Sequence, residues 1–268
     1  MSVGRTMSRA LAPVKAHATL VSFRLPKNWR SDPMTGNWER KLGLIVPSWN
    51  TVMEYEVQRM AGPTMSAHSV RIPHTADTEE NLLGLATRAP EVAKLLAHAK
   101  VHVIGYGCTA GGFLKGPEGD RKTGAEIAEA TGIPAATSAT AIADALRAVG
   151  ARRVGVASPY AAWLNERVRR FLEADGFEVV AIQGLGTEAH ATITLERVEA
   201  LAAEVNRPEA QAIFISCSNF RTLEIIESLE RRFGKPVVTS NASTMWKMLR
   251  VIGDKRAIPG AGRLFREA

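Results

Sequence analysis

The chain has 268 residues, of which 46% are hydrophobic and 23% charged, an ordinary balance for a globular protein with a sizeable core. No apolar run approaches the about 18 residues that a membrane-spanning helix needs, and two cysteines are too few for a disulfide framework. These features exclude an integral membrane protein and a disulfide-stapled secreted domain. We therefore expect a cytoplasmic protein with two free thiols.

The net charge of +7 is concentrated in the N-terminal part of the chain. Residues 1–41 hold eight of the 34 basic side chains and two of the 27 acidic ones, so this segment carries +6 and the remainder +1. A basic arm can bind nucleic acid or an anionic lipid surface, but a solvated tail is the simpler interpretation. We expect residues 1–40 to form an irregular extension, and we expect neither nucleic acid nor a membrane as a partner.

Apolar runs typical of buried strands alternate along the chain with amphipathic stretches typical of helices. The expected strands cover residues 42–46, 100–107, 134–138, 153–158, 177–182, 212–216 and 236–240. Helical patterns lie between them, among them 78–99, 139–150 and 160–176, and the last two end at glycines, as helices often do. This alternation predicts an α/β fold with mostly parallel strands and helices on both faces.

The second part of this pattern repeats the first. LGLIVPSWN (42–50) resembles VGVASPYAAWLN (154–165), VHVIGYGCT (101–109) resembles AIFISCSN (212–219), and GIPAATSATAIADALRAVG (132–150) resembles GKPVVTSNASTMWKMLRVIG (234–253). The matches keep the same order and pair Cys108 with Cys217. We therefore predict two similar flavodoxin-like halves, 41–150 and 151–268, related by a pseudo-twofold axis with the active site between them.

Cys108 and Cys217 are both expected just after a strand, at the edge where ligands bind in open parallel sheets. If the halves face each other, the two thiols approach one cleft from opposite sides. A thiolate is a nucleophile and a base, and a thiol is an acid near neutral pH. Such a pair could racemise a carbon centre by removing a proton from one face and delivering one to the other. It could also isomerise a double bond by addition, rotation and elimination.

Both reactions need groups that hold a substrate carboxylate and the developing negative charge. The residues after each cysteine offer backbone N–H groups, hydroxyls and an amide for this purpose. Other polar residues stand at the matching strand ends and would complete the pocket. The candidates are Thr109, Ala110, Ser218, Asn219, Ser48, Asn50, Tyr160 and Thr239.

Other residues with chemical potential fit simpler interpretations. The histidines show no metal-ligand spacing and the Gly111–Gly112 pair is no dinucleotide fingerprint, so we predict no metal and no cofactor. We expect the acidic residues of the first helix, Glu54 and Glu56, to face solvent. The segment GFLKGPEGDRKTG (112–124), rich in glycine and charge, is the candidate for a loop that closes over the site.

Residues 41–253 resemble the aspartate/glutamate racemase superfamily, most closely its maleate cis–trans isomerases and next its arylmalonate decarboxylases. The segments that carry the resemblance are VPSWNTVMEYE (46–56), HSVRI (68–72), GYGC (105–108), SPYAAWLNERV (158–168) and SCSN (216–219). The resemblance implies Asn50 as a carboxylate ligand, Cys108 as the nucleophile, Tyr160 as a donor to the substrate and Cys217 as the acid.

Two positions separate the members of this group. The decarboxylases keep only the second cysteine, so the presence of both favours an isomerase or a racemase. The isomerases have a further asparagine downstream of the tyrosine, whereas GLGTEAHAT (184–192) has none and offers His190 as a carboxylate partner.

The resemblance therefore implies a cofactor-independent isomerase of a small dicarboxylate, with maleate to fumarate as the leading reaction. A two-cysteine racemase of an amino acid or hydantoin, and an arylmalonate-type decarboxylase, are the alternatives. Because both halves present apolar helix faces, we expect a homodimer or a homotetramer.

Overall fold

The computed structural model describes residues 38–268, and the basic extension predicted at residues 1–40 lies almost wholly outside this range. The strands are β1 (Arg40–Pro47), β2 (Met65–Ile72), β3 (Val103–Tyr106), β4 (Ala135–Thr137), β5 (Arg153–Ser158), β6 (Glu178–Gly184), β7 (Ala212–Ile215) and β8 (Val237–Thr239). The α-helices are α1 (Met53–Ala61), α2 (Glu79–His98), α3 (Thr109–Thr131), α4 (Ser138–Ala148), α5 (Ala162–Ala174), α6 (Leu195–Glu204), α7 (Ile226–Phe233), α8 (Ser240–Val251) and α9 (Arg263–Glu267). Short 3₁₀ turns form η2 (His190–Thr192) and η3 (Leu223–Ile225).

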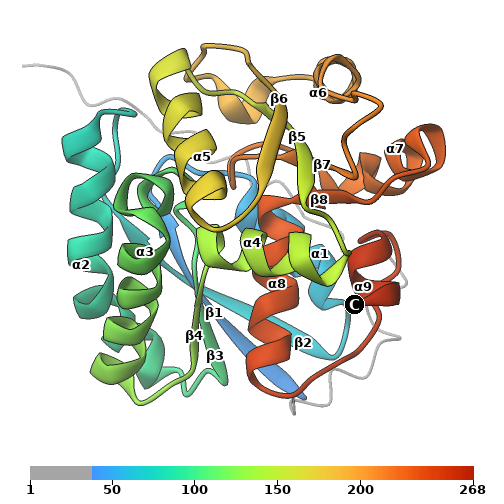
Figure 1. Cartoon of the computed structure of the whole chain (residues 1–268). Coiled ribbons are helices and arrows are strands. Elements are labelled where there is room, and N and C mark those ends of the chain that lie inside the picture. Colours follow the sequence, from blue (N-terminus) through green and yellow to red (C-terminus); the bar gives the residue numbers. More distant parts are fainter. Residues whose placement is uncertain (1–37) are drawn as a thin grey trace, which may run out of the picture. The chain divides into compact units, whose positions relative to one another are not determined.

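The predicted repeat is visible in the sheets. One sheet has the strand order β2-β1-β3-β4 and the other has the order β6-β5-β7-β8, with all pairs parallel. In each sheet the second strand lies on one side of the first strand, and the third and fourth strands follow on its other side. Because crossovers between parallel strands are right-handed, α1 lies on one face of the first sheet and α2 and α3 lie on the other (Figure 1). The α/β fold class predicted from the sequence is confirmed.

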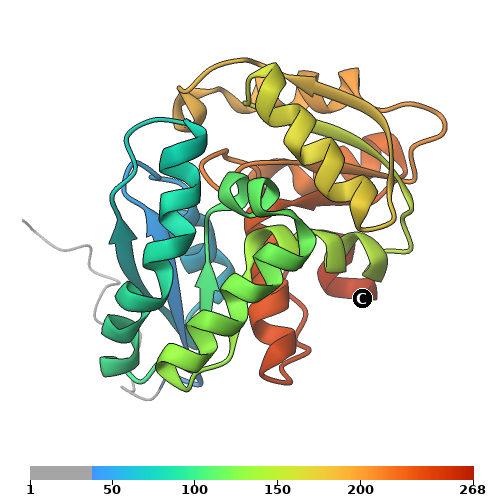
Figure 2. The same ribbon diagram turned by 60° about the vertical axis from the view of Figure 1, so that its left-hand side comes forward.

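One helix of the second half covers part of one face of the first sheet. Helix α8 packs on β3 and β4, and a Cβ added to Gly105 of β3 would stand 2.5 Å from the sulfur of Met248. The equivalent helices α4 and α8 also pack against each other, and the hydroxyls of Ser138 and Thr244 are 2.8 Å apart. Figure 2 shows α8 standing beside the first sheet rather than beside its own. The domain boundary placed between residues 150 and 151 stays a prediction.

The edge strand β2 was not among the predicted strands. This strand is only partly buried and carries polar side chains such as His68 and Arg71, because its outer edge has no neighbouring strand. The central strand β1 is the opposite case, since it is buried from Leu42 to Pro47 and reads as one apolar run.

The predicted lid over residues 112–124 is wrong. These residues belong to α3, which is bent at Gly116 (φ 72°) ahead of Pro117. Gly112 serves close packing, since a Cβ there would stand 2.5 Å from a carboxylate oxygen of Asp120, and Gly116 allows the positive φ of the bend. Among the described residues, no helix combines the length and the apolar character needed to cross a bilayer.

Candidate active site

Cys108 stands where β3 ends and α3 begins. It is the N-cap residue of that helix, and its sulfur accepts a hydrogen bond from the N–H of Gly111 at 3.3 Å. A Cβ at Gly111 would lie 3.0 Å from this sulfur and 2.9 Å from the carbonyl of Leu82, so only glycine allows the approach. A helix N-terminus favours a negative charge, and it therefore favours the thiolate form of Cys108.

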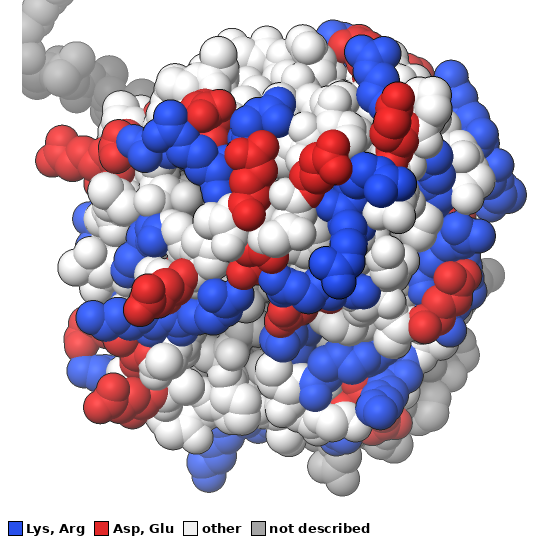
Figure 3. Space-filling model, in the orientation of Figure 1, with Lys and Arg blue, Asp and Glu red and all other residues white. Residues whose placement is uncertain are grey.

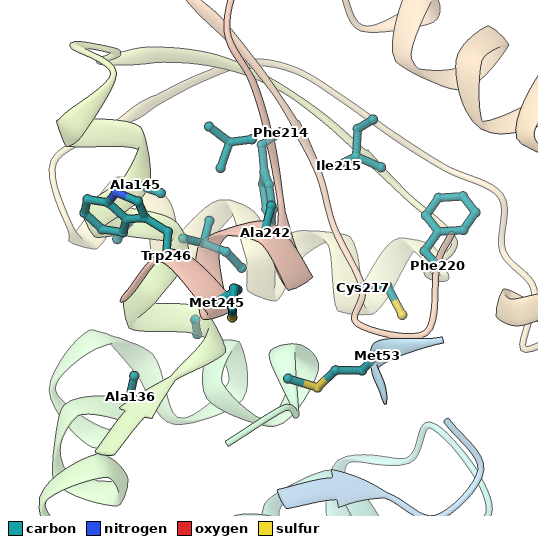
Figure 4. Close-up of a cluster of buried hydrophobic side chains, with 14 of the residues drawn as sticks. Met53, Ala136, Ala145, Phe214, Ile215, Cys217, Phe220, Ala242, Met245 and Trp246 are labelled. Carbon is teal, nitrogen blue, oxygen red and sulfur yellow. The ribbon is translucent and has the colours of Figure 1, made fainter. Parts of the chain in front are cut away.

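Cys217 follows β7 and has an unusual backbone conformation for a residue with a side chain, with φ of 101°. Its N–H donates to the hydroxyl of Ser240 at 2.9 Å, and its sulfur accepts from the N–H of Asn219 at 3.4 Å. Such backbone conformations cost about 1–3 kcal/mol and collect at functional sites. In Figure 4 Cys217 and Phe220 lie on the loop after β7, with Met53 of the first half below them.

The two cysteines line one small cavity of about 20 Å³ between the two sheets. Both are almost fully buried, at 4% exposure for Cys108 and 7% for Cys217. The other lining residues are Pro47, Trp49, Asn50, His74, Asp77, Leu82, Thr109, Ala110, Tyr160, His190, Ser218 and Asn219. The cavity therefore combines both thiols with side chains from both halves of the chain.

Two of the predicted ligands are not brought to this cavity. The hydroxyl of Ser48 accepts from the N–H of His74 and donates to its carbonyl, so it fixes the segment after β2. Thr239 is fully buried and caps α8 by accepting from the N–H of Ala242 at 3.4 Å. Strand-end position alone did not separate these structural hydroxyls from residues that line the cavity.

A hydrogen-bonded bridge joins the two halves at the cavity. The side-chain amide of Asn50 donates to the hydroxyl of Ser218 at 3.0 Å, and that hydroxyl donates to the carbonyl of Gly107 at 2.7 Å. Beside it, the N–H of Thr51 donates to the side-chain oxygen of Asn219 at 2.9 Å. The loops that carry Cys108 and Cys217 are therefore held in register with each other.

Below this bridge, Glu56 of α1 is buried rather than solvated, which corrects the expectation from the sequence. Its carboxylate accepts from the N–H groups of Thr222 and Leu223 at 2.6 and 2.8 Å and from the amide of Asn241 at 2.7 Å. Asn241 also donates to the carbonyl of Ser218 at 3.1 Å. Glu56 thus supports the segment that follows Cys217.

Several groups of the cavity have perturbed proton affinities. Burial raises the pKa of both Cys108 and Cys217 to about 12, although the N–H groups of Gly111 and Asn219 act in the opposite direction. Burial also raises the pKa of Tyr160 well above its ordinary value. The hydroxyls of Tyr160 and Thr109 are buried without a hydrogen-bond partner in the described chain, so both can donate to a bound anion.

A cluster of which sequence reasoning recognised only His190 forms one wall of the cavity. Asp77 lies between two buried imidazoles, with its carboxylate 3.1 Å from Nε2 of His74 and 3.6 Å from Nε2 of His190. Trp49 meets the edges of both rings, at centroid distances of 4.4 and 5.7 Å. Asp77 and His74 follow β2, so recognising that strand would have placed them at the ligand-binding edge of the sheet.

His190 itself was predicted as a carboxylate partner, and the structure places it in the cavity wall. It is 2% exposed, and its Nδ1 lies 3.5 Å from the sulfur of Cys217. Within residues 38–268, no group of three or more histidine, cysteine or acidic side chains is arranged to hold a metal ion.

Comparisons with known proteins agree with the family resemblance. The model of the arylmalonate decarboxylase family matches residues 42–265. A maleate isomerase of Nocardia farcinica is 33% identical over 241 residues, which cover 85% of this chain and 96% of that protein. An arylmalonate decarboxylase of Bordetella bronchiseptica is 34% identical over 204 residues, covering 69% of this chain and 85% of that protein.

Solved structures extend the agreement to the fold. A cysteine-to-serine variant of the Nocardia farcinica maleate cis–trans isomerase, with a covalently bound succinylcysteine intermediate, superposes with a TM-score of 0.82. It is 29% identical in sequence, and the match covers 85% of this chain and 99% of that one. From its sequence, its paired sheets and its cysteine-lined cavity, this chain belongs to the arylmalonate decarboxylase family.

Proposed function

We propose that this protein is a cofactor-independent cis–trans isomerase of a small unsaturated dicarboxylate, with maleate to fumarate as its reaction. The observation that carries the proposal is the presence of both Cys108 and Cys217 in the lining of one cavity. The family resemblance implies that the decarboxylases need only the second thiol. The relatives named maleate isomerase span nearly the whole described chain, and one of them holds a succinyl group on a cysteine.

In the proposed reaction, the thiolate of Cys108 adds to one alkene carbon while Cys217 delivers its proton to the other. The carbon–carbon bond of the resulting succinyl adduct is single and can rotate. Cys217 then takes a proton back, the carbon–sulfur bond breaks, and the trans alkene leaves.

Carboxylate binding falls to the groups that surround the thiols. Asn50 and Ser218 hold one end of the cavity, and the unpartnered hydroxyls of Thr109 and Tyr160 are available to an anion. These roles add charge-assisted hydrogen bonds where negative charge develops in the adduct. Ala110 and Asn219 complete the lining around the two thiols.

Proton NMR of the purified protein with maleate in deuterated water tests the proposal. We expect fumarate to appear with the wild-type chain and not with Cys108→Ala or Cys217→Ala. Unchanged maleate with the wild-type protein, or full turnover by Cys108→Ala, would overturn it.

Racemisation of an amino acid is the second candidate, and one observation favours it. Asp77 places a carboxylate in the cavity wall, where it could accept the ammonium group of an amino acid. This alternative predicts solvent deuterium at the α-carbon of aspartate or glutamate in the same experiment, with no fumarate from maleate.

We also propose that the protein acts in the cytoplasm as a homodimer or homotetramer on a small carboxylate, without nucleic acid. Both cysteines are free thiols, as a reducing compartment would keep them. On the face shown in Figure 3, basic side chains alternate with acidic ones instead of forming a single positive surface. Sedimentation velocity gives the oligomeric state directly, and a monomer across micromolar concentrations would contradict this part.

A further inference from the structure

A line of polar groups at hydrogen-bond or ion-pair distances runs from Cys217 into the wall of the cavity. The sulfur of Cys217 lies 3.5 Å from Nδ1 of His190, and Nε2 of that ring lies 3.6 Å from Oδ2 of Asp77. The other oxygen of Asp77 lies 3.1 Å from Nε2 of His74. A thiol, an imidazole and a carboxylate in this order form the arrangement in which the imidazole can exchange a proton with the thiol.

The imidazole of His190 is held in place by its surroundings. The ring is buried, and the edges of Trp49 and Tyr160 meet it at centroid distances of 5.7 and 5.9 Å. Trp49 also packs on His74, whose backbone is fixed on both sides by Ser48. The residues of the line come from three separate parts of the chain, namely the β2–α2 connection, η2 and the loop after β7.

The two cysteines differ in this respect. The sulfur of Cys108 accepts from the N–H of Gly111, and no imidazole of the described chain lies within hydrogen-bonding distance of it. Cys217 has a comparable backbone donor in Asn219 and, in addition, His190. The cavity is therefore chemically asymmetric although the fold that builds it is a repeat.

We propose that Cys217, His190 and Asp77 form a proton relay that turns Cys217 into the base of this site. The S–H bond of Cys217 breaks, its electron pair stays on sulfur, and the proton forms a bond to Nδ1 of His190. Nε2–H of the imidazolium faces Asp77, which holds the positive charge. His190 is a catalytic residue in this scheme because it exchanges a proton with a reacting sulfur, and Asp77 is a positioning residue.

The relay gives a buried thiol a way to ionise. Because burial raises the pKa of both thiols to about 12, release of a proton to water would leave an isolated buried thiolate. A transfer over 3.5 Å instead produces an adjacent pair of opposite charges. Burial lowers the pKa of His190 and His74 acts in the same direction, whereas Asp77, the backbone of Thr187 and Glu188 raise it. Asp77 is the largest of the groups that favour the cationic ring.

The use of the relay in catalysis rests on the proposed function. The thiolate of Cys217 would take the proton of Cys108 across the cavity, and the Cys108 thiolate would then add to the alkene as Cys217 returns that proton to carbon. The two sulfurs share one proton throughout, and the imidazolium offsets their single negative charge. His190 stands where the isomerases are expected to carry an asparagine, so the relay would be a feature of this chain.

Thiol ionisation in the absence of substrate tests the relay. Cys108→Ser leaves Cys217 as the single thiol, and its thiolate absorbance in the ultraviolet is followed against pH. We expect the midpoint of Cys217 to rise by about one to two pH units when His190→Gln is added. Asp77→Asn removes support for the imidazolium but also removes a negative charge that raises the pKa of Cys217, so it should change the midpoint less than His190→Gln does.

Two controls make the outcome specific. His98→Gln, at an exposed position on α2, should leave the midpoint unchanged. Cys217→Ser leaves Cys108, which should ionise at higher pH than Cys217 does. Alkylation by iodoacetamide with mass spectrometry provides a second readout of the same order, and His190→Asn replaces His190→Gln if circular dichroism shows that the latter is unfolded.

Identical midpoints with and without His190, or a lower midpoint for Cys108 than for Cys217, would overturn the relay. Because no substrate is present, this failure is separate from failure of the proposed function. If the protein turns over maleate but the midpoint of Cys217 does not depend on His190, the relay alone is rejected. If the midpoint depends on His190 but maleate is not turned over, the proposed substrate alone is rejected.

Discussion

The side-chain amide of Asn50 reaches from the first half of the chain to the hydroxyl of Ser218 in the second, at 3.0 Å. Its oxygen accepts from the N–H groups of Val52 and Met53, both at 2.9 Å, and so caps the first turn of α1. One amide therefore holds the start of a helix and the loop of the opposite cysteine. Its position decides both the stability of the chain and the geometry of the two thiols.

Substitution at Asn50 should separate these two effects. Asn50→Ala removes the cap and the bridge, so we expect the free energy of unfolding to fall by about 1–3 kcal/mol and turnover to be lost. Asn50→Asp keeps the acceptor for α1 but has no donor for Ser218, so it should lose turnover at a smaller cost in stability. Urea unfolding and maleate turnover measure the pair, and wild-type kinetics for Asn50→Asp would contradict the bridge.

Glu56 should make stability depend on pH in an unusual direction. Burial raises its pKa above the ordinary value of 4.5, despite the hydrogen bonds from Leu223, Thr222 and Asn241. Between that value and its raised one, the folded state binds more protons than the unfolded state, so the free energy of unfolding falls as pH rises through this window. Glu56→Gln should lack this component, whereas Glu91→Gln, at an exposed position of α2, should keep it.

Urea unfolding at a series of pH values gives the comparison. The prediction concerns the difference between wild type and Glu56→Gln, which removes the contributions of all other carboxyl groups. A difference that does not change with pH above 4.5 would show that Glu56 is not protonated on folding.

Two glycines of α3 should respond in opposite ways to the same substitution. At Gly111 a Cβ would crowd the carbonyl of Leu82 and the sulfur of Cys108, so Gly111→Ala should cost about 1–3 kcal/mol and most of the activity. At Gly124 the nearest atom would be a methyl of Thr137 at 3.4 Å, an ordinary contact. Gly124→Ala should therefore stabilise the helix by up to about 1 kcal/mol and leave turnover intact.

Thermal unfolding measures the change in stability of these two variants, and steady-state kinetics measures the change in turnover. Equal effects at both positions would mean that helix propensity, rather than the approach to Cys108, decides the outcome.

Tyr160→Phe should affect activity but not stability. The buried hydroxyl of Tyr160 has no hydrogen-bond partner in the described chain, so its removal leaves no other group unsatisfied. If the hydroxyl donates to the substrate, kcat/KM should fall by at least about tenfold, which corresponds to roughly 1.4 kcal/mol of lost stabilisation. The exposed Tyr55 of α1 offers the matched control, Tyr55→Phe, for which we expect neither change.

Much of the fold could be predicted because it is repeated. Strands buried on both faces form uninterrupted apolar runs such as residues 42–46, and the recurrence of Cys108 at Cys217 placed both thiols at strand ends. The edge strand β2 was missed because its less buried positions include His68, Ser69 and Arg71, which interrupt the apolar run. The connection after it, with His74 and Asp77, was missed for the same reason.

The glycine-rich segment 112–124 was predicted as a loop but belongs to α3. Composition there indicates a loop, but a Cβ at Gly112 would stand 2.6 Å from the side chain of Ala139 on α4, so this glycine is small because another helix approaches it. Glu56 likewise has the sequence pattern of a solvated helix residue, and only the arrival of Thr222 and Leu223 from the other half buries it. Contacts between distant segments decide both cases, and a local pattern does not contain them.

The position of helix α8 means that the first half cannot be fully packed until residues 240–251 have been translated. Because residues 240–251 cover β3 and β4, one face of the first sheet stays open while the second half is still being translated. The apolar side chains of that face are then accessible to chaperones and to other nascent chains. A ribosome that stalls before α8 would hold a chain with both cysteines present and one face of its first sheet partly uncovered, so a functional cavity requires translation through residue 251.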